Sequence, residues 1–188
     1  MQLHTSLTDF LAEYAEIPTL AYHFVSCRDM QYVSDQDLNL VSKVNDLAPY
    51  NNYPTHQGAL SLTRKHDFNW EAFRLTLDLA KLRTRYRIEP VHFMNVTHFA
   101  EYGEDGRDGA LHKQDMYNNQ YELRLYTKQV GVQIPLLPYL VRIDVSPKIL
   151  HCFDELEAGM QLTQELRAKL PVPVKVSPTF APAHRIGR

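Results

Sequence analysis

Apolar and polar residues alternate most regularly over residues 121–128, which read Tyr-Glu-Leu-Arg-Leu-Tyr-Thr-Lys. Successive side chains of a strand point to opposite faces of a sheet, so this alternation predicts a strand with one buried and one solvated face. Shorter apolar runs, bounded by turn-forming residues, predict further strands. These runs are residues 19–26, 58–63, 91–99 and 139–145.

In four other stretches the apolar residues recur at the three- and four-residue steps of a helix. Ser34 followed by Asp37 resembles a capping box before the second stretch. The third has a wide apolar face, which is typical of a helix packed on a sheet. The expected helices cover residues 5–16, 35–47, 70–86 and 149–170.

The order of these elements favours an α+β fold. Hairpin-like strands cluster between residues 90 and 145 without the crossover helix that a parallel sheet needs. We therefore expect a single layered domain at residues 1–170, with three to four helices packed on a mixed, mostly antiparallel sheet. Residues 171–188 form a proline-rich, extended C-terminal tail that could add only an edge strand, because proline is excluded from central strands.

Composition and charge exclude several classes of protein. Of the 188 residues, 44% are hydrophobic and 22% are charged, which excludes a disordered tail, a collagen-like fibre and a membrane-embedded bundle. The 20 Lys and Arg stand against 22 Asp and Glu, for a formal net charge of −2. Nucleic-acid binding usually requires a basic excess. A nucleic-acid partner is therefore possible through a local patch but is not favoured, and we expect no membrane partner.

The cysteines and the start of the chain suggest a cytoplasmic protein. Cys27 and Cys152 lie far apart and outside any CxxC pair, so a four-thiolate zinc site is excluded and two reduced, buried thiols are expected. The first residues lack the basic and apolar regions of a signal peptide. The most apolar stretch, residues 130–145, contains Pro135 and Pro138 and cannot be a transmembrane helix.

No motif for a nucleotide or for a familiar hydrolase is present. The chain contains neither GxGxxG nor GxxxxGK[ST], and neither GxSxG nor HExxH. Residues 103–109 hold three of the seven glycines in an acidic loop, whose carboxylates would repel phosphate. We therefore expect no cofactor.

One group of polar residues beside this loop suggests an enzyme as an alternative. His98 and Glu101 precede the loop, and His112 and Asp115 follow it. If the two sides pair, these residues could form a general acid–base pair or a metal site of the histidine/carboxylate type. The alternative function is a small metal- or histidine-dependent hydrolase acting on phosphodiesters or nucleic acid. The simpler interpretation is a solvated hairpin end that happens to be polar.

Basic residues gather at Arg64 and Lys65 and again from Lys81 to Arg87. Arg85 and Arg87 would share a strand face and could bind a phosphate or an acidic partner. The simpler interpretation is that cations are favoured near a helix C-terminus.

Tyrosines near turns indicate a protein-binding surface. Tyrosine offers a large contact area with a polar tip at a small entropic cost. An apolar loop stiffened by prolines, residues 134–139, is costly to expose unless it packs on the core or on a partner. The main hypothesis is a non-catalytic accessory or inhibitor-type domain that binds another protein or itself, as a homo-oligomer. Its expected binding residues are Leu136, Tyr139, Tyr121, Tyr126, Arg85 and Arg87. Ordinary packing at sheet edges is the competing interpretation.

Overall fold

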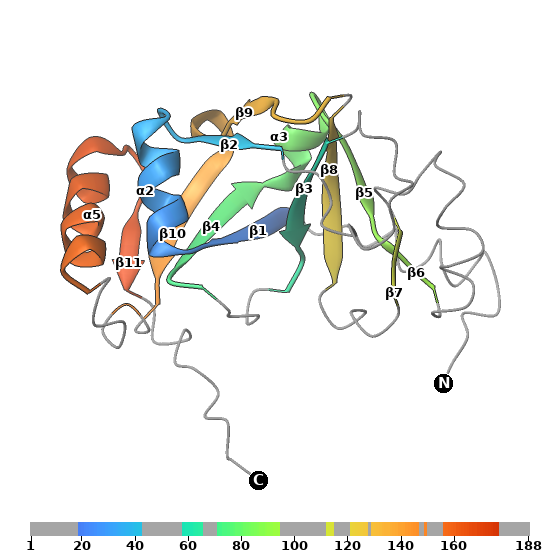
Figure 1. Ribbon diagram of the computed structural model, residues 1–188. Helices are drawn as coiled ribbons and strands as arrows, with labels where there is room; N and C mark the ends of the chain where they lie inside the picture. Colours follow the sequence, from blue (N-terminus) through green and yellow to red (C-terminus); the bar gives the residue numbers. More distant parts are fainter. Residues whose placement is uncertain are drawn as a thin grey trace, which may run out of the picture.

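The structure is a computed structural model. It describes residues 19–42, 58–65, 71–94, 112–114, 121–127, 129–146, 149 and 156–176. This part contains a mixed, mostly antiparallel sheet and three α-helices, an α+β arrangement as expected (Figure 1). No helix in it has the length and apolar character needed to cross a membrane.

A seven-stranded sheet forms the centre of the described structure. Its neighbouring strands are antiparallel except for β10 and β11, which are parallel. In spatial order the strands are β11 (Val174–Val176), β10 (Leu140–Val145), β4 (Phe73–Asp78), β1 (Leu20–Val25), β3 (Gly58–Thr63), β8 (Glu122–Thr127) and β5 (Arg87–Pro90). The expected edge strand after Pro171 is therefore present as β11.

Two small strand pairs accompany this sheet. β2 (Asn39–Val41) is antiparallel to β9 (Gln133–Pro135). β6 (His92–Met94) is parallel to β7 (His112–Gln114), although 17 residues separate them in sequence. The second pair brings the two sides of the 103–109 stretch together, but that stretch lies outside the described residues.

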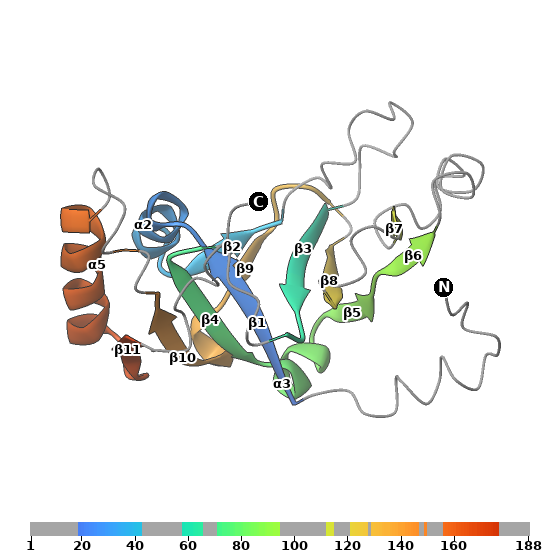
Figure 2. The same ribbon diagram turned by 90° about the horizontal axis from the view of Figure 1, so that it is seen from below.

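The helices occupy two regions. α2 (Cys27–Asp35) and α5 (Leu156–Lys169) lie side by side next to β10 and β11 (Figure 2). The short α3 (Leu79–Arg83) follows β4 directly and contacts β1, β5 and the 3-10 turn η3 (Leu137–Tyr139).

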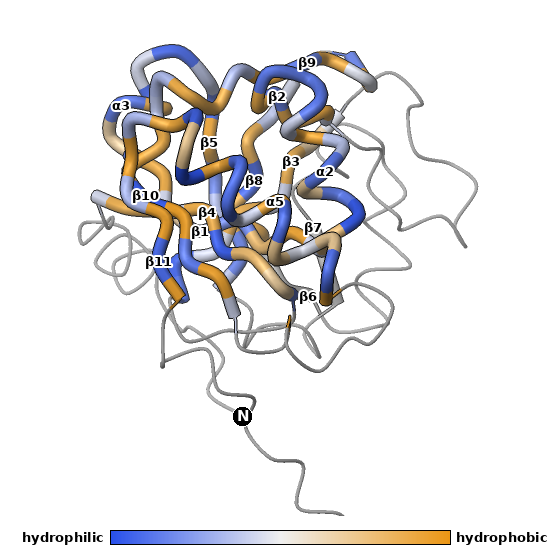
Figure 3. The backbone as a smooth tube through the Cα atoms, turned by 90° about the vertical axis from the view of Figure 1, so that its left-hand side faces the viewer, coloured by the Kyte–Doolittle hydropathy of each residue, from blue (hydrophilic) through white to orange (hydrophobic). Residues whose placement is uncertain are grey.

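One face of the sheet forms the hydrophobic core because the registers align its apolar positions. Leu75 faces Ile143 across β4 and β10, and Leu125 lies between Leu60 and Ile88. These residues are buried, together with Met30 of α2. Apolar and polar positions alternate along the strands and along α5 in Figure 3, so each element turns one side to the core.

The prediction of a helix that begins at residue 35 is wrong. α2 begins earlier, because the Ser26 side chain accepts a hydrogen bond from the Asp29 backbone and caps the helix there. It ends where Asp37 and Leu38 adopt φ values of 51° and 59°, and the chain continues as β2. Leu38 and Val41, the first two residues of the expected helical spacing, thus belong to a turn and a strand, and the rest of the spacing lies outside the described residues.

The helix expected at residues 70–86 is also wrong. Residues 73–78 form β4, near the centre of the sheet, and only residues 79–83 are helical. Phe73, Leu75 and Leu77 fit a period of two as well as a helical stripe, and the intervening Arg74 is buried through an ion pair. Strands β1, β3, β8 and β10 match the expected strands, and α5 falls within the expected 149–170 helix. The expected helix at residues 5–16 lies outside the described part.

Candidate functional site

The face of the sheet opposite the core is polar. The register that buries Phe73 and Leu75 on one face puts Arg74 and Thr76 on the other, beside Asp144 of β10. Across the sheet, the pairing of β3 with β8 sets Ser61 opposite Arg124 on the same polar face. Guanidinium and carboxylate groups thus lie on both halves of this face.

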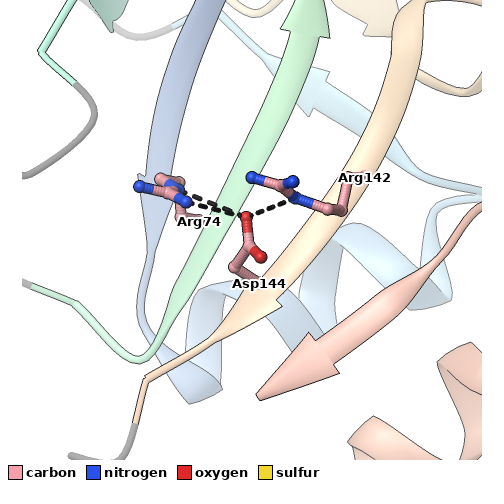
Figure 4. A network of polar contacts seen from close by, with 3 residues as sticks. All are labelled: Arg74, Arg142 and Asp144. Atoms are coloured by element: carbon pink, nitrogen blue, oxygen red, sulfur yellow. Dashed lines mark hydrogen bonds and ion pairs between the residues drawn. The ribbon is translucent and has the colours of Figure 1, made fainter. Parts of the chain in front are cut away.

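The first polar network joins two arginines to one carboxylate (Figure 4). Asp144 Oδ2 lies 3.0 Å from Arg74 Nη2 and 2.9 Å from Arg142 Nε. The side chains of Arg74 and Asp144 are buried, whereas that of Arg142 is 40% exposed. The Arg74 guanidinium also lies 5.1 Å from the ring centroid of Tyr22, close enough for a cation–π contact. Two cations thus share one carboxylate oxygen in this network.

The second network ties β3 to β8. Ser61 Oγ donates to Glu122 Oε1 at 2.6 Å, and Arg124 Nε donates to the same oxygen at 2.9 Å. Glu122 and Arg124 are both buried. His23 contacts the backbone carbonyl of Ser61, at 2.7 Å, rather than its hydroxyl. The Ser61 hydroxyl, the His23 imidazole and the Glu122 carboxylate therefore do not form a nucleophile–base relay.

Leu136 and Tyr139, two of the expected binding residues, are located in the core. Leu136 is 1% exposed, and Tyr139 is buried against the ring of Tyr86. Burial raises the pKa of the Tyr86 hydroxyl, and the adjacent Tyr139 raises it further. The proline-rich loop packs on its own chain, so in this fold neither side chain is on the surface.

Arg85, Arg87 and Tyr126 lie near the β5 edge of the sheet without converging on one point. Arg87 forms an ion pair with Glu89 of its own strand and lies 5.2 Å from the ring centroid of Tyr126. Arg85 lies 6.0 Å from the ring centroid of Tyr86. Each arginine is thus placed against a tyrosine, and the charge of Arg87 is offset.

Tyr121 differs from these residues because it is exposed and its backbone is strained. Its side chain is 46% exposed, and its φ of 47° lies in the left-handed region. Arg64 and Lys65, which follow β3, hold their cationic groups 5.7 and 6.0 Å from its ring centroid. The Arg64 backbone N–H donates to the Tyr121 carbonyl at 3.1 Å and fixes the two segments together.

Arg83, at the end of α3, interacts electrostatically with Arg64. Its pKa is lowered first by burial and then by the positive charge of Arg64. The sequence shows both groups of basic residues and the tyrosine. It gives no signal that Arg64 and Lys65 flank Tyr121 or that the charge of Arg64 acts on Arg83, because both depend on pairings between distant strands.

The candidate catalytic residues are only partly described. His98, Glu101 and Asp115 lie outside the described residues, so their expected site stays a prediction. His112 begins β7, where it pairs in register with His92 of β6. Within the described ranges, no group of three or more His, Cys, Asp and Glu residues could hold a metal ion. Cys27 is buried, as expected, and Cys152 lies outside the described residues.

Comparisons with known proteins found no relative of this chain. No family model matches the chain. Neither a curated protein nor a solved structure matches it. The function has to be argued from the geometry and chemistry of the chain itself.

Proposed function

We propose that this chain is a non-catalytic, protein-binding domain of the accessory or inhibitor type, which contacts its partner through Tyr121 and the residues around it. The observation that carries the proposal is that a half-exposed tyrosine is held at a φ of 47°. A bulky residue in this region costs on the order of 1–3 kcal/mol, and such strain concentrates at functional sites.

The surroundings of Tyr121 suit a contact residue. Its backbone is fixed by the hydrogen bond from Arg64, and its ring is flanked by the cations of Arg64 and Lys65. A side chain that is already positioned loses little conformational entropy when a partner binds. Tyrosine and arginine are also the residues that most often dominate the energy of protein interfaces.

The polar face of the sheet supports a non-catalytic role. Asp144 and Glu122 are buried and accept hydrogen bonds from arginines. A general base needs a carboxylate that can take up a proton from a substrate. Carboxylates held in this way stabilise the sheet and are poor candidates for catalysis.

Light scattering tests the proposal, with the chain purified together with whatever binds it. We expect a mass above the 21.8 kDa of one chain, from a second copy or from a partner. Tyr121→Glu should lower that mass to the monomer value while leaving the chain folded. Tyr32→Glu is the matched control, because Tyr32 on α2 is 52% exposed and lies outside the proposed surface. A monomer throughout, with no co-purifying partner, would contradict the proposal.

A second candidate function is a metal- or histidine-dependent hydrolase acting on phosphodiesters or nucleic acid. The parallel register of β6 and β7 favours it, because it sets His92 directly beside His112. Neighbouring strands lie about 4.8 Å apart, so the two residues are adjacent in space. His98, Glu101 and Asp115 would complete the site, and Arg85 and Arg87 would bind the substrate phosphate.

Metal analysis and activity measurements discriminate the second candidate. A hydrolase should retain a transition metal or cleave a model phosphodiester, and His112→Ala or His98→Ala should abolish the cleavage. Purified chain without bound metal, together with an activity that both substitutions leave unchanged, would eliminate this candidate.

A further inference from the structure

Two cationic side chains lie beside the exposed Tyr121, and a third interacts electrostatically with one of them. We call the three side chains the Tyr121 cation cluster. They are Arg64 and Lys65, which follow β3, and Arg83, the last residue of α3. The cationic groups of Arg64 and Lys65 lie within 6.0 Å of the Tyr121 ring centroid. Arg83 is close enough for the charge of Arg64 to act on it.

Two cations of this cluster, Lys65 and Arg83, differ from three arginines elsewhere in the described structure. Arg74, Arg87 and Arg124 each form an ion pair with a carboxylate. Neither Lys65 nor Arg83 forms an ion pair within the described segments. Lys65 and Arg83 therefore contribute positive charge that no described carboxylate pairs with, on a chain whose formal net charge is −2.

Arg83 also has a donor that the described structure leaves unused. Its Nε is buried and has no hydrogen-bond partner among the described residues. A buried donor without a partner is costly, and a guanidinium is suited to bind a carboxylate through two parallel hydrogen bonds. The mutual repulsion of Arg64 and Arg83 adds to this cost, because it lowers the pKa of Arg83 after the larger effect of burial. A bound anion would relieve both costs.

We propose that the Tyr121 cation cluster docks an acidic segment of a partner protein, whose carboxylates bind Arg83 and Lys65 while a neighbouring apolar side chain packs on Tyr121. This inference rests on the proposed function and specifies the chemistry of the partner. Nucleic acid fits less well, because it needs an extended basic surface. The formal net charge of the chain, −2, offers no such excess of positive charge.

Fluorescence anisotropy with a defined probe tests the inference. The probe is a short fluorescein-labelled peptide of glutamates flanking one phenylalanine, added to the full chain at low salt. We expect saturable binding that Arg83→Gln and Lys65→Gln each weaken by about three- to tenfold, from the loss of one charge-assisted hydrogen bond. Arg28→Gln, at an exposed position of α2, removes the same charge and should leave the affinity unchanged.

The outcomes separate this inference from the proposed function. If Tyr121→Glu disrupts an assembly but the peptide does not bind, the proposed function stands and the acidic partner is wrong. Equal weakening by Arg28→Gln and Arg83→Gln would also overturn the inference, because it would indicate general charge attraction only. The same holds if a single-stranded oligonucleotide binds more tightly than the peptide. Circular dichroism confirms that each variant is folded before it is scored.

Discussion

The ring of Tyr139 meets the ring of Tyr86 edge to face, with centroids 6.1 Å apart and planes inclined at 70°. This contact anchors the 3-10 turn η3 to the segment between α3 and β5. It explains why Tyr139 is buried, although the sequence presents its proline-rich loop as a candidate surface. Leu136 and Tyr139 of this loop pack into the hydrophobic core of their own chain.

This contact predicts a pH dependence of stability at alkaline pH. Burial, followed by the influence of Tyr139, raises the pKa of Tyr86 above its ordinary value of about 10. The folded state therefore holds this proton at a pH where the unfolded state has released it, and the free energy of unfolding falls as the pH rises above about 10. Urea titrations should show a shallower fall for Tyr86→Phe, and an unchanged slope for the exposed control Tyr32→Phe. Identical slopes in the wild type and Tyr86→Phe would contradict the prediction.

The buried ion pair of β4 and β10 predicts a large difference between two substitutions. Asp144→Asn removes the negative charge 3.0 Å from the buried Arg74 guanidinium, so we expect a loss of about 3–5 kcal/mol in the free energy of unfolding. Arg142→Gln removes the half-exposed partner of the same carboxylate and should cost about 1 kcal/mol or less. Equilibrium urea denaturation measures both values, and equal losses would argue against the arrangement in Figure 4.

The position of the proline-rich loop predicts the effect of truncating two neighbouring leucines. Leu136 is in the core, whereas Leu137 is 42% exposed. Leu136→Ala should destabilise the chain by about 2–5 kcal/mol, and Leu137→Ala by about 0.5 kcal/mol or less. Thermal unfolding distinguishes the two. If instead Leu136→Ala dissociates an assembly without destabilising the monomer, the loop is an interface after all.

The lack of space around Gly58, at the start of β3, predicts that a larger residue at this position destabilises the fold. A Cβ atom there would lie 2.5 Å from Thr127 Oγ1 and 2.7 Å from the backbone oxygen of Gln129. The backbone oxygen cannot move without disturbing the turn after β8, so Gly58→Ala should cost about 1–3 kcal/mol. Gly58→Ala with wild-type stability in urea would show that this junction is more open.

The sequence predicted an element correctly where the spacing of its apolar residues fits a strand or a helix but not both. Residues 121–128 alternate regularly, and β8 is found there, but its polar face is not solvated as expected, because Glu122 and Arg124 are buried in a polar network. Residues 70–86 satisfy the helical and the strand period together, and the choice depends on Arg74. Its burial is stabilised by the ion pair with Asp144, 70 residues away, and no local pattern carries that information.

The candidate site shows the same limit. Tyr121 is recognisable in the sequence as an aromatic residue beside a turn. Its left-handed φ is unexpected for a tyrosine, and its proximity to Arg64 follows from the pairing of β3 with β8. Leu136 and Tyr139 have the composition of an interface, but only the three-dimensional structure shows that their own core covers them.

Site-specific photo-crosslinking tests the central claim most directly. A benzoylphenylalanine replaces Tyr121 in one variant and the equally exposed Tyr32 in the other, and both are irradiated in the cells that make the protein. Binding through Tyr121 predicts a discrete cross-linked species, with one partner or a second copy, from position 121 and none from position 32. Cross-links that are absent from position 121, or equally abundant from both positions, would contradict it.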